Sequence, residues 1–159
     1  MKLTEDQERW LAALESGQYS QGRHALCTAE PNGGPGRFYC CLGVAEASLG
    51  TEMIGPTFMD GRLMMSFARR EDGAVEASVR TALLSSSWRR LGLQSAIGDL
   101  NMEHKDAFDA ALLQHAAHLS AKAVAQVACL TSYNDKTGAP FKAIAAAIRA
   151  VPEAVFTVC

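Results

Sequence analysis

The feature that most constrains the fold is an apolar run at residues 38–45, which closely follows the densest cluster of glycine and proline in the chain. That cluster, residues 31–36 (PNGGPG), contains too many helix- and strand-breaking residues to form anything but a loop. The run itself reads FYCCLGVA and contains no proline. Because a favourable helix stop follows at Gly50, we predict a buried helix that starts near Cys40. A buried strand over residues 38–44 is the alternative, since a short apolar run cannot be assigned by periodicity alone.

The N-terminal segment carries a helix signal followed by a weaker strand signal. Thr4 and Gln7 have the spacing of a capping box, and apolar residues of one helical face follow them, so we predict a helix over residues 5–16. The mixed pattern after this helix contains one short apolar stretch, and we predict a brief strand over residues 25–28.

Two Asp-Gly pairs mark the central segment, residues 51–84, as a hairpin region. Asp60-Gly61 and Asp72-Gly73 each lie between apolar runs. Because Asp-Gly is favoured in the two-residue turns that join antiparallel strands, we predict a small antiparallel β-meander of about three strands.

The C-terminal half is rich in alanine and its pattern is helical. We predict, in chain order, a short helix that ends at Gly92, two helices or one kinked helix over residues 106–119 and 120–133, a last helix between Pro140 and Pro152, and an added strand over residues 155–158. With 48% hydrophobic and 20% charged residues, the chain fits one globular domain, residues 1–159. The expected fold class is therefore α+β, a mainly helical single domain with a small antiparallel β-meander.

Charge and cysteine content narrow the choice of partners and compartment. Fifteen Lys and Arg residues against 17 Asp and Glu residues give a net charge of −2, so a nucleic-acid partner is not expected. The N-terminus lacks the apolar core of a signal peptide, and no run approaches the ~18 apolar residues of a membrane span, so we expect a cytoplasmic protein without a membrane partner. An odd number of cysteines favours reduced thiols over a disulfide framework.

Three pieces of the sequence resemble, in the same order, motifs of a group of small bacteriophage and prophage proteins. They are W-x-x-A-L-x-S-G-x-Y-x-Q from Trp10, Y-C-C-L-G-V from Tyr39, and N-D-x-x-G-x-x-F-x-x-I-A from Asn134. The resemblance implies an accessory protein of a phage or mobile element in the cytoplasm of a bacterial host cell. It transfers no activity to any residue, and the segment at residues 51–84 has no counterpart in the group.

The cysteine pair supports one catalytic hypothesis. A thiol at a helix N-terminus has a lowered pKa, because the helix dipole and free N–H groups favour the thiolate. The residues of this hypothesis are Cys40 or Cys41 as nucleophile, His24 or His118 as base, and Asn134 or Asp135 as orienting group. The alternative is a pair of small buried residues at the start of a core helix, since cysteine is among the most buried residue types.

Other polar residues are candidates for binding rather than catalysis. The binding candidates are Tyr19, Gln21, Arg69, Arg70, Asn134 and Asp135. His115 and His118 lie three residues apart on a predicted helix, so they could share one face toward a metal, with His104 or a cysteine completing the set. Because neither a CxxC nor an HExxH spacing accompanies them, we expect no metal site and no cofactor.

The sequence thus leaves two hypotheses, a binding protein and an enzyme. We favour a binding or interaction module that acts on a host protein or a small-molecule ligand, because no complete catalytic set is present. Counter-defence proteins, such as anti-CRISPR proteins, belong to this class. The alternative is a cysteine-dependent hydrolase or transferase that uses Cys40 or Cys41.

Overall fold

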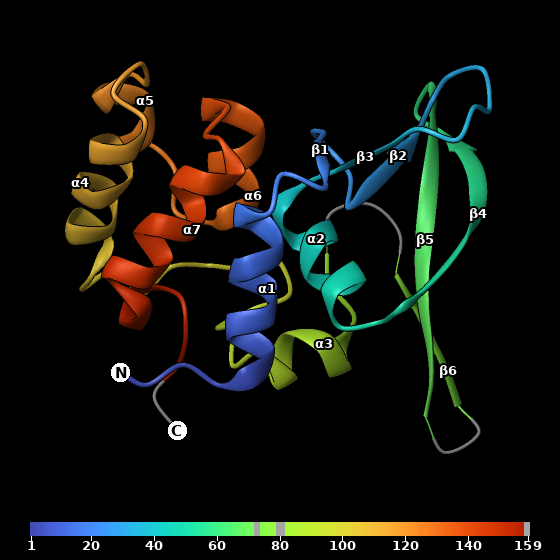
Figure 1. The fold of residues 1–159 in the computed structure, drawn as a ribbon, viewed down its shortest axis with the longest axis horizontal. Coiled ribbons are helices and arrows are strands. Elements are labelled where there is room, and N and C mark those ends of the chain that lie inside the picture. The colour runs from blue at the N-terminus through green and yellow to red at the C-terminus, as the bar shows by residue number, and fades with distance from the viewer. Residues whose placement is uncertain (72–73, 79–81, 158–159) are drawn as a thin grey trace.

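The computed structural model describes residues 1–71, 74–78 and 82–157. Its helices and helical turns are α1 (Glu5–Glu15), α2 (Cys41–Ser48), α3 (Ser85–Arg90), α4 (Lys105–His115), α5 (Ala121–Ala125), α6 (Leu130–Ser132), the π-helical turn η1 (Tyr133–Thr137), α7 (Phe141–Ala150) and the 3-10 turn η2 (Pro152–Ala154). Its strands are β1 (Ser20–Gln21), β2 (Cys27–Ala29), β3 (Arg37–Tyr39), β4 (Glu52–Met59), β5 (Arg62–Glu71) and β6 (Ala74–Ser78). Figure 1 shows α4 to α7 at one end of the molecule and β4 to β6 at the other, with α1, α2 and α3 between them. The α+β class is confirmed.

The sheet is larger than the antiparallel meander predicted from the sequence. Strands β4, β5 and β6 are antiparallel neighbours, as expected, but the sheet has six strands in the order β1-β3-β2-β5-β4, with β6 also paired to β5. Strands β1 and β3 run parallel, so the sheet is mixed. The prediction of a small antiparallel meander was wrong because β1 and β3 span only two and three residues, too few to show an alternating pattern.

The predicted turn at Asp60-Gly61 is confirmed. Met59 pairs with Arg62, which leaves a two-residue turn, and the φ angles of Asp60 and Gly61 are 52° and 76°. Positive φ at both positions is the requirement of a type I′ hairpin turn, which Asp-Gly satisfies at low cost. The second predicted turn, at residues 72–73, lies outside the described residues.

The first two helices begin where the sequence predicts. Helix α1 starts after a complete capping box of Thr4 and Gln7. Helix α2 starts after Cys40, whose Sγ accepts a hydrogen bond of 3.4 Å from the Gly43 N–H. The alternative of a strand over residues 38–44 applies only as far as Tyr39, where β3 ends.

The C-terminal half is more broken than predicted. Helix α4 ends at His115, and the predicted helix over residues 120–133 is replaced by α5, α6 and part of η1. The break falls at Cys129, which is extended at φ −143° and ψ 153° and forms a β-bridge with Asp99. The expected strand at residues 155–158 is reduced, within the described residues, to one bridge between Phe156 and Leu93. The predicted helix between the two prolines is α7.

The first two motif pieces meet helix α6 in the core. The Trp10 Nε1–H donates to the Cys41 carbonyl at 3.0 Å, and the Cys41 thiol donates to the Leu130 carbonyl at 3.5 Å. A Cβ at Gly43 would lie 1.7 Å from the Leu26 carbonyl oxygen, so α2 packs backbone against backbone on the segment before β2. The cysteine pair thus lies at a junction of the fold. Among the described residues, no helix is long and apolar enough to cross a membrane.

Candidate functional site

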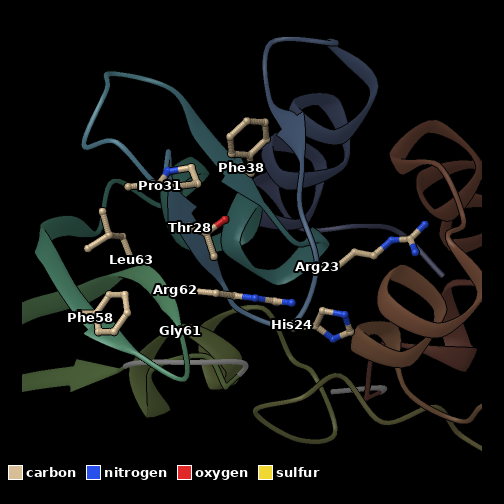
Figure 2. A pocket seen from close by; sticks show the side chains of 10 residues that line it. Arg23, His24, Thr28, Pro31, Phe38, Phe58, Gly61, Arg62 and Leu63 are labelled. Atoms are coloured by element: carbon tan, nitrogen blue, oxygen red, sulfur yellow. The ribbon is translucent and has the colours of Figure 1, made fainter.

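A cleft of about 500 Å³ opens over β2, β3 and the β4–β5 hairpin, which is within the size range of small-molecule sites. Its lining residues, most of which Figure 2 labels, are Arg23, His24, Thr28, Ala29, Pro31, Phe38, Phe58, Gly61, Arg62 and Leu63. A second hollow of about 310 Å³ shares His24 and Arg62 with the cleft and adds Asp60 and Met64. The two hollows therefore meet at His24 and Arg62.

The sheet register brings these distant residues together. Thr28 of β2 pairs with Phe38 of β3 on one side and with Met64 of β5 on the other. The type I′ turn then returns the chain so that Phe58 of β4 pairs with Leu63 of β5. The pairing of Thr28 with Met64 joins segments remote in the sequence, so a local pattern predicts the β4–β5 turn but not the whole cleft.

Two phenyl rings that line the cleft are open to solvent. The Phe58 residue is 72% exposed and Phe38 is 38% exposed. Full burial of a phenylalanine side chain is worth about 1.5–3 kcal/mol, and folding realises little of this for Phe58. The two rings therefore offer apolar surface that a ligand can cover.

The basic side chains that line the cleft are Arg62, His24 and Arg23. Figure 2 shows the Arg62 side chain extended toward His24, whereas Arg23 reaches away toward the C-terminal helices. Neither the Arg23 nor the Arg62 guanidinium forms a hydrogen bond or ion pair with any residue that the structure describes. Within the described part of the chain, no Asp or Glu lines the larger cleft. The charge of the larger cleft therefore suits an anionic ligand.

His24 has a strained backbone, with a φ angle of 68°. A side-chain-bearing residue in this left-handed region costs on the order of 1–3 kcal/mol unless its surroundings hold it there. The His24 Nδ1 lies 3.9 Å from the Asp135 Oδ2, and the imidazole remains exposed at the cleft. The strain thus coincides with a residue that lines both hollows.

The π-helical turn η1 supports this strained segment. The buried Asn134 donates from Nδ2 to the Gly22 carbonyl at 2.8 Å, and its Oδ1 accepts from the Gln21 Nε2 at 3.0 Å. Gly138, which ends this turn, has a φ angle of 71°, a left-handed conformation that favours glycine. Isolated π-helical turns occur frequently at functional sites. Three of the predicted binding residues, Gln21, Asn134 and Asp135, therefore come together and position the wall of the cleft.

The remaining predicted binding residues lie elsewhere. Tyr19 packs edge-on against Tyr39, with ring centroids 5.1 Å apart. Arg69 and Arg70 lie in the part of β5 that pairs with β6, and the Arg69 guanidinium donates to the Thr51 hydroxyl at 3.0 Å. None of these three lines the cleft, whereas Phe38, Phe58 and Arg62, which do, were not among the predicted site residues.

Arg69 belongs to a network of polar contacts at the start of α3. The fully buried Glu46 carboxylate accepts hydrogen bonds from the Thr51 hydroxyl at 2.7 Å, the Ser87 hydroxyl at 2.7 Å and the Leu84 N–H at 2.8 Å. Because Leu84 is the N-cap of α3, this carboxylate fixes the start of that helix against α2. Arg69 therefore extends a structural network through Thr51.

The cysteine hypothesis finds no support in the environment of the thiols. Cys40 and Cys41 are 1% and 0% exposed. Burial raises the pKa of the Cys40 thiol to about 12 and the pKa of the Cys41 thiol well above its usual value, so desolvation outweighs the helix N-terminus. The Cys40 Sγ and Cys41 Sγ pair with backbone groups, and no histidine in the described ranges bonds to either. Both thiols remain protonated at neutral pH.

The metal arrangement considered for His104, His115 and His118 does not form. Across residues 1–71, 74–78 and 82–157, no group of three His, Cys, Asp or Glu side chains comes close enough to hold a metal ion.

Comparisons with known proteins return no match: no protein family, curated protein or solved structure resembles the chain significantly. Fold and cleft define the class here, an α+β protein with an exposed aromatic and cationic cleft on its sheet. The assignment of function therefore depends on the chemistry of that cleft.

Proposed function

We propose that the protein is a binding module for a small anionic ligand that has a flat apolar part, held in the cleft over β2, β3 and the β4–β5 hairpin. One observation carries the proposal: exposed Phe38 and Phe58 line the same cleft as the unpaired Arg62 and the strained His24. The rings cover an apolar surface, and the guanidinium binds a carboxylate or phosphate group.

The groups in the cleft suit holding a ligand more than transforming it. Arginine supplies fixed positive charge, and Thr28 supplies a hydroxyl with no partner among the described residues. The sulfur atoms that would act as nucleophiles lie in the core, paired to backbone groups. We therefore propose sequestration or sensing of the ligand as the activity.

The motif resemblance suggests a setting for this activity. In an accessory protein of a phage or mobile element, a module that sequesters an anionic metabolite or signal of the host would act without turnover. Counter-defence by removal of such a signal belongs to this proposal. Its test in cells is whether expression of the protein rescues phage growth on a host with a defence system, and whether Arg62→Gln abolishes the rescue.

The first biochemical test uses phenyl phosphate, which joins one ring to one phosphate. Titration calorimetry should show binding of phenyl phosphate and much weaker binding of phenol and of inorganic phosphate. Arg62→Gln should weaken the binding by at least about tenfold, since one charge-assisted hydrogen-bond pair is worth on the order of 1.5–3 kcal/mol. Lys142→Gln, which removes one positive charge from an exposed position on α7, is the matched control and should bind as the wild type does.

Two results would contradict the proposal. One is the absence of any binding of phenyl phosphate to the folded wild-type protein. The other is an equal loss of affinity in Arg62→Gln and Lys142→Gln, because such a result would show a general effect of net charge rather than a site.

A second candidate function is docking of a host protein on the outer strands. Ile54 of β4 and Val75 of β6 are exposed apolar residues, and they lie outside the residues that line the cleft. If this surface carries the function, a double variant Ile54→Thr and Val75→Thr should lose one defined host partner that Arg62→Gln retains. If Arg62→Gln loses the partner and the double variant keeps it, the cleft carries the function.

A further inference from the structure

We infer that the ligand of the cleft is a free nucleotide with a single phosphate, its base against Phe58 and its phosphate between Arg62 and His24. This inference rests on the proposed function and names its ligand class. Three properties of the cleft support it: the aromatic rings, the Arg62 and His24 side chains, and the lining of the adjoining hollow.

The rings match a nucleobase. Bases stack on exposed aromatic side chains, and each stacked base is worth about 1–3 kcal/mol. Phe58 lies on β4 and Phe38 on β3, with β5 and β2 between them, so a base stacks on Phe58 while Phe38 bounds the other side of the cleft. The Thr28 hydroxyl on β2 lines the same cleft and can donate to, or accept from, the edge of a base or a sugar hydroxyl. A ligand with a flat π-face and a polar edge uses all three groups.

The Arg62 and His24 side chains suit a phosphate. An arginine guanidinium presents a fork of N–H donors that fits two phosphate oxygens at once. Figure 2 shows Arg62 extended toward His24, and these two residues are shared by both hollows. A phosphate at this junction reaches both side chains while the rest of the ligand lies in the larger hollow.

The smaller hollow restricts the number of phosphates. Asp60 lines it beside His24 and Arg62, and its backbone is fixed by the type I′ turn. Among the described lining residues of this hollow, Arg62 and His24 are the only basic side chains, so a second phosphate here would compete with the first for the same two groups. The larger hollow has no Asp or Glu among its described lining residues. One phosphate therefore fits the charges better than three.

The net charge of the protein and the size of the cleft favour a free nucleotide over a polynucleotide. The net charge is −2, and binding of a polynucleotide depends on a basic track along many phosphates. The cleft instead combines one short cationic side with two rings, in a volume of about 500 Å³. That size suits a single small molecule.

The experiment is titration calorimetry of the full chain with adenosine monophosphate and uridine monophosphate, compared with phenyl phosphate, adenosine, inorganic phosphate, adenosine triphosphate and a single-stranded oligonucleotide. At least one monophosphate should bind about tenfold tighter than phenyl phosphate, since a base offers a larger π-face and a polar edge. Phe58→Ala should weaken nucleotide binding by at least about fivefold, which is the lower end of the range for one stacked base.

Each other outcome has a defined meaning. If phenyl phosphate binds and no monophosphate binds tighter, the nucleotide inference is wrong while the proposed function stands. If neither binds, both are wrong. Adenosine triphosphate binding tenfold tighter than the monophosphate would overturn the single-phosphate assignment, and tighter, strongly salt-dependent binding of the oligonucleotide would assign a nucleic acid instead.

The variants keep this test independent of folding. Phe58 is largely exposed, so its truncation leaves no cavity in the core. Arg62 is exposed and unpaired, and Arg62→Gln provides a second loss-of-binding variant if the first fails to fold. Lys142→Gln again serves as the variant with unchanged binding, and circular dichroism and thermal unfolding of all three confirm the fold.

Discussion

The helical core and the sheet cleft differ in how their residues are used. In the core, residues of the first two motif pieces are buried and closely packed: Trp10 donates to the backbone of Cys41, and Gly43 packs against the Leu26 carbonyl. In the cleft, common residue types are exposed and unpaired, with Phe58 and Arg62 as the main examples. The comparison teaches that the residues of the recognisable sequence motifs stabilise the core. The surface that suits a ligand consists of residues that belong to no such motif.

One element joins the two regions. The turn η1 lies in the helical part, yet its Asn134 and Asp135 contact the segment that carries His24. The resemblance motif from Asn134 therefore acts on the cleft indirectly, through position. The predictions below separate effects on the scaffold from effects on the cleft.

The largest expected effect is on the scaffold. Gly43→Ala places a Cβ 1.7 Å from the Leu26 carbonyl oxygen, so backbone must move, and we expect a loss of about 3 kcal/mol or more in the free energy of unfolding. Gly55→Ala is the control, because a Cβ at Gly55 meets nothing within 4 Å. Urea unfolding of both variants measures the difference. Equal stability of the two would show that α2 does not pack on the Leu26 backbone as described.

The next effect concerns the buried thiols and alkaline pH. The pKa of the Cys40 thiol is 9.0 in the unfolded chain and about 12 in the folded protein. Below pH 9 both states are protonated and the contribution to stability is fully present. As pH rises from 9 to 12 the unfolded chain ionises first, so the free energy of unfolding falls by about 1.4 kcal/mol per pH unit for this group. Burial also raises the pKa of Cys27, to about 11, which adds to the fall.

Cys40→Ser tests the alkaline effect, since serine is a good N-cap and does not ionise in this range. In reducing buffer, urea unfolding at about pH 8 and about pH 10.5 should show a smaller loss of stability for the variant than for the wild type. Rapid alkylation of Cys40 or Cys41 in the folded protein at neutral pH would instead revive the cysteine hypothesis.

Asn134→Ala should affect both regions. It removes the hydrogen bonds to the Gly22 carbonyl and the Gln21 side chain inside a buried site, which costs about 1–3 kcal/mol of unfolding free energy. Because the segment with His24 loses its support, the affinity for phenyl phosphate should fall as well. Gln21→Ala, at an exposed position, should have a smaller effect on stability. Unchanged affinity in a destabilised Asn134→Ala would show that η1 does not position the cleft.

The smallest effect on stability is expected in the cleft itself. Phe58→Ala should change the free energy of unfolding by no more than about 0.5 kcal/mol, because the ring is largely exposed. Phe67→Ala on the neighbouring strand removes a fully buried ring and should cost about 3–5 kcal/mol.

Arg70→Gln, at the far end of β5 from the cleft, tests the arginine predicted from the sequence and should leave the affinity for phenyl phosphate unchanged. A loss of affinity there would move the site toward β6.

Local signals in the sequence predicted the elements that local interactions determine. The capping box before α1, the Asp60-Gly61 turn and the Cys40 start of α2 are formed by neighbouring residues, and each was found as expected. The helix predicted over residues 120–133 failed because the bridge of Cys129 with Asp99 is non-local.

The distinction between local and non-local interactions also explains which residues of the site were predicted from the sequence. Gln21, Asn134 and Asp135 were predicted as binding residues, and their side chains do lie together. They support the segment that carries His24 and do not line the cleft themselves. Phe38, Phe58 and Arg62 line the cleft through a sheet register that sets residues from three strands side by side. Such a register depends on pairings across the chain, which periodicity in one segment does not reveal.

The most direct test of the central claim is a map of backbone amide chemical shifts on titration with phenyl phosphate. We predict that the shifts concentrate at Thr28, Phe58 and Arg62, with His24 also affected, and that they disappear in Arg62→Gln. Shifts centred on Cys40 and Cys41, or shifts that Arg62→Gln leaves intact, would contradict the assignment of the sheet cleft as the binding site.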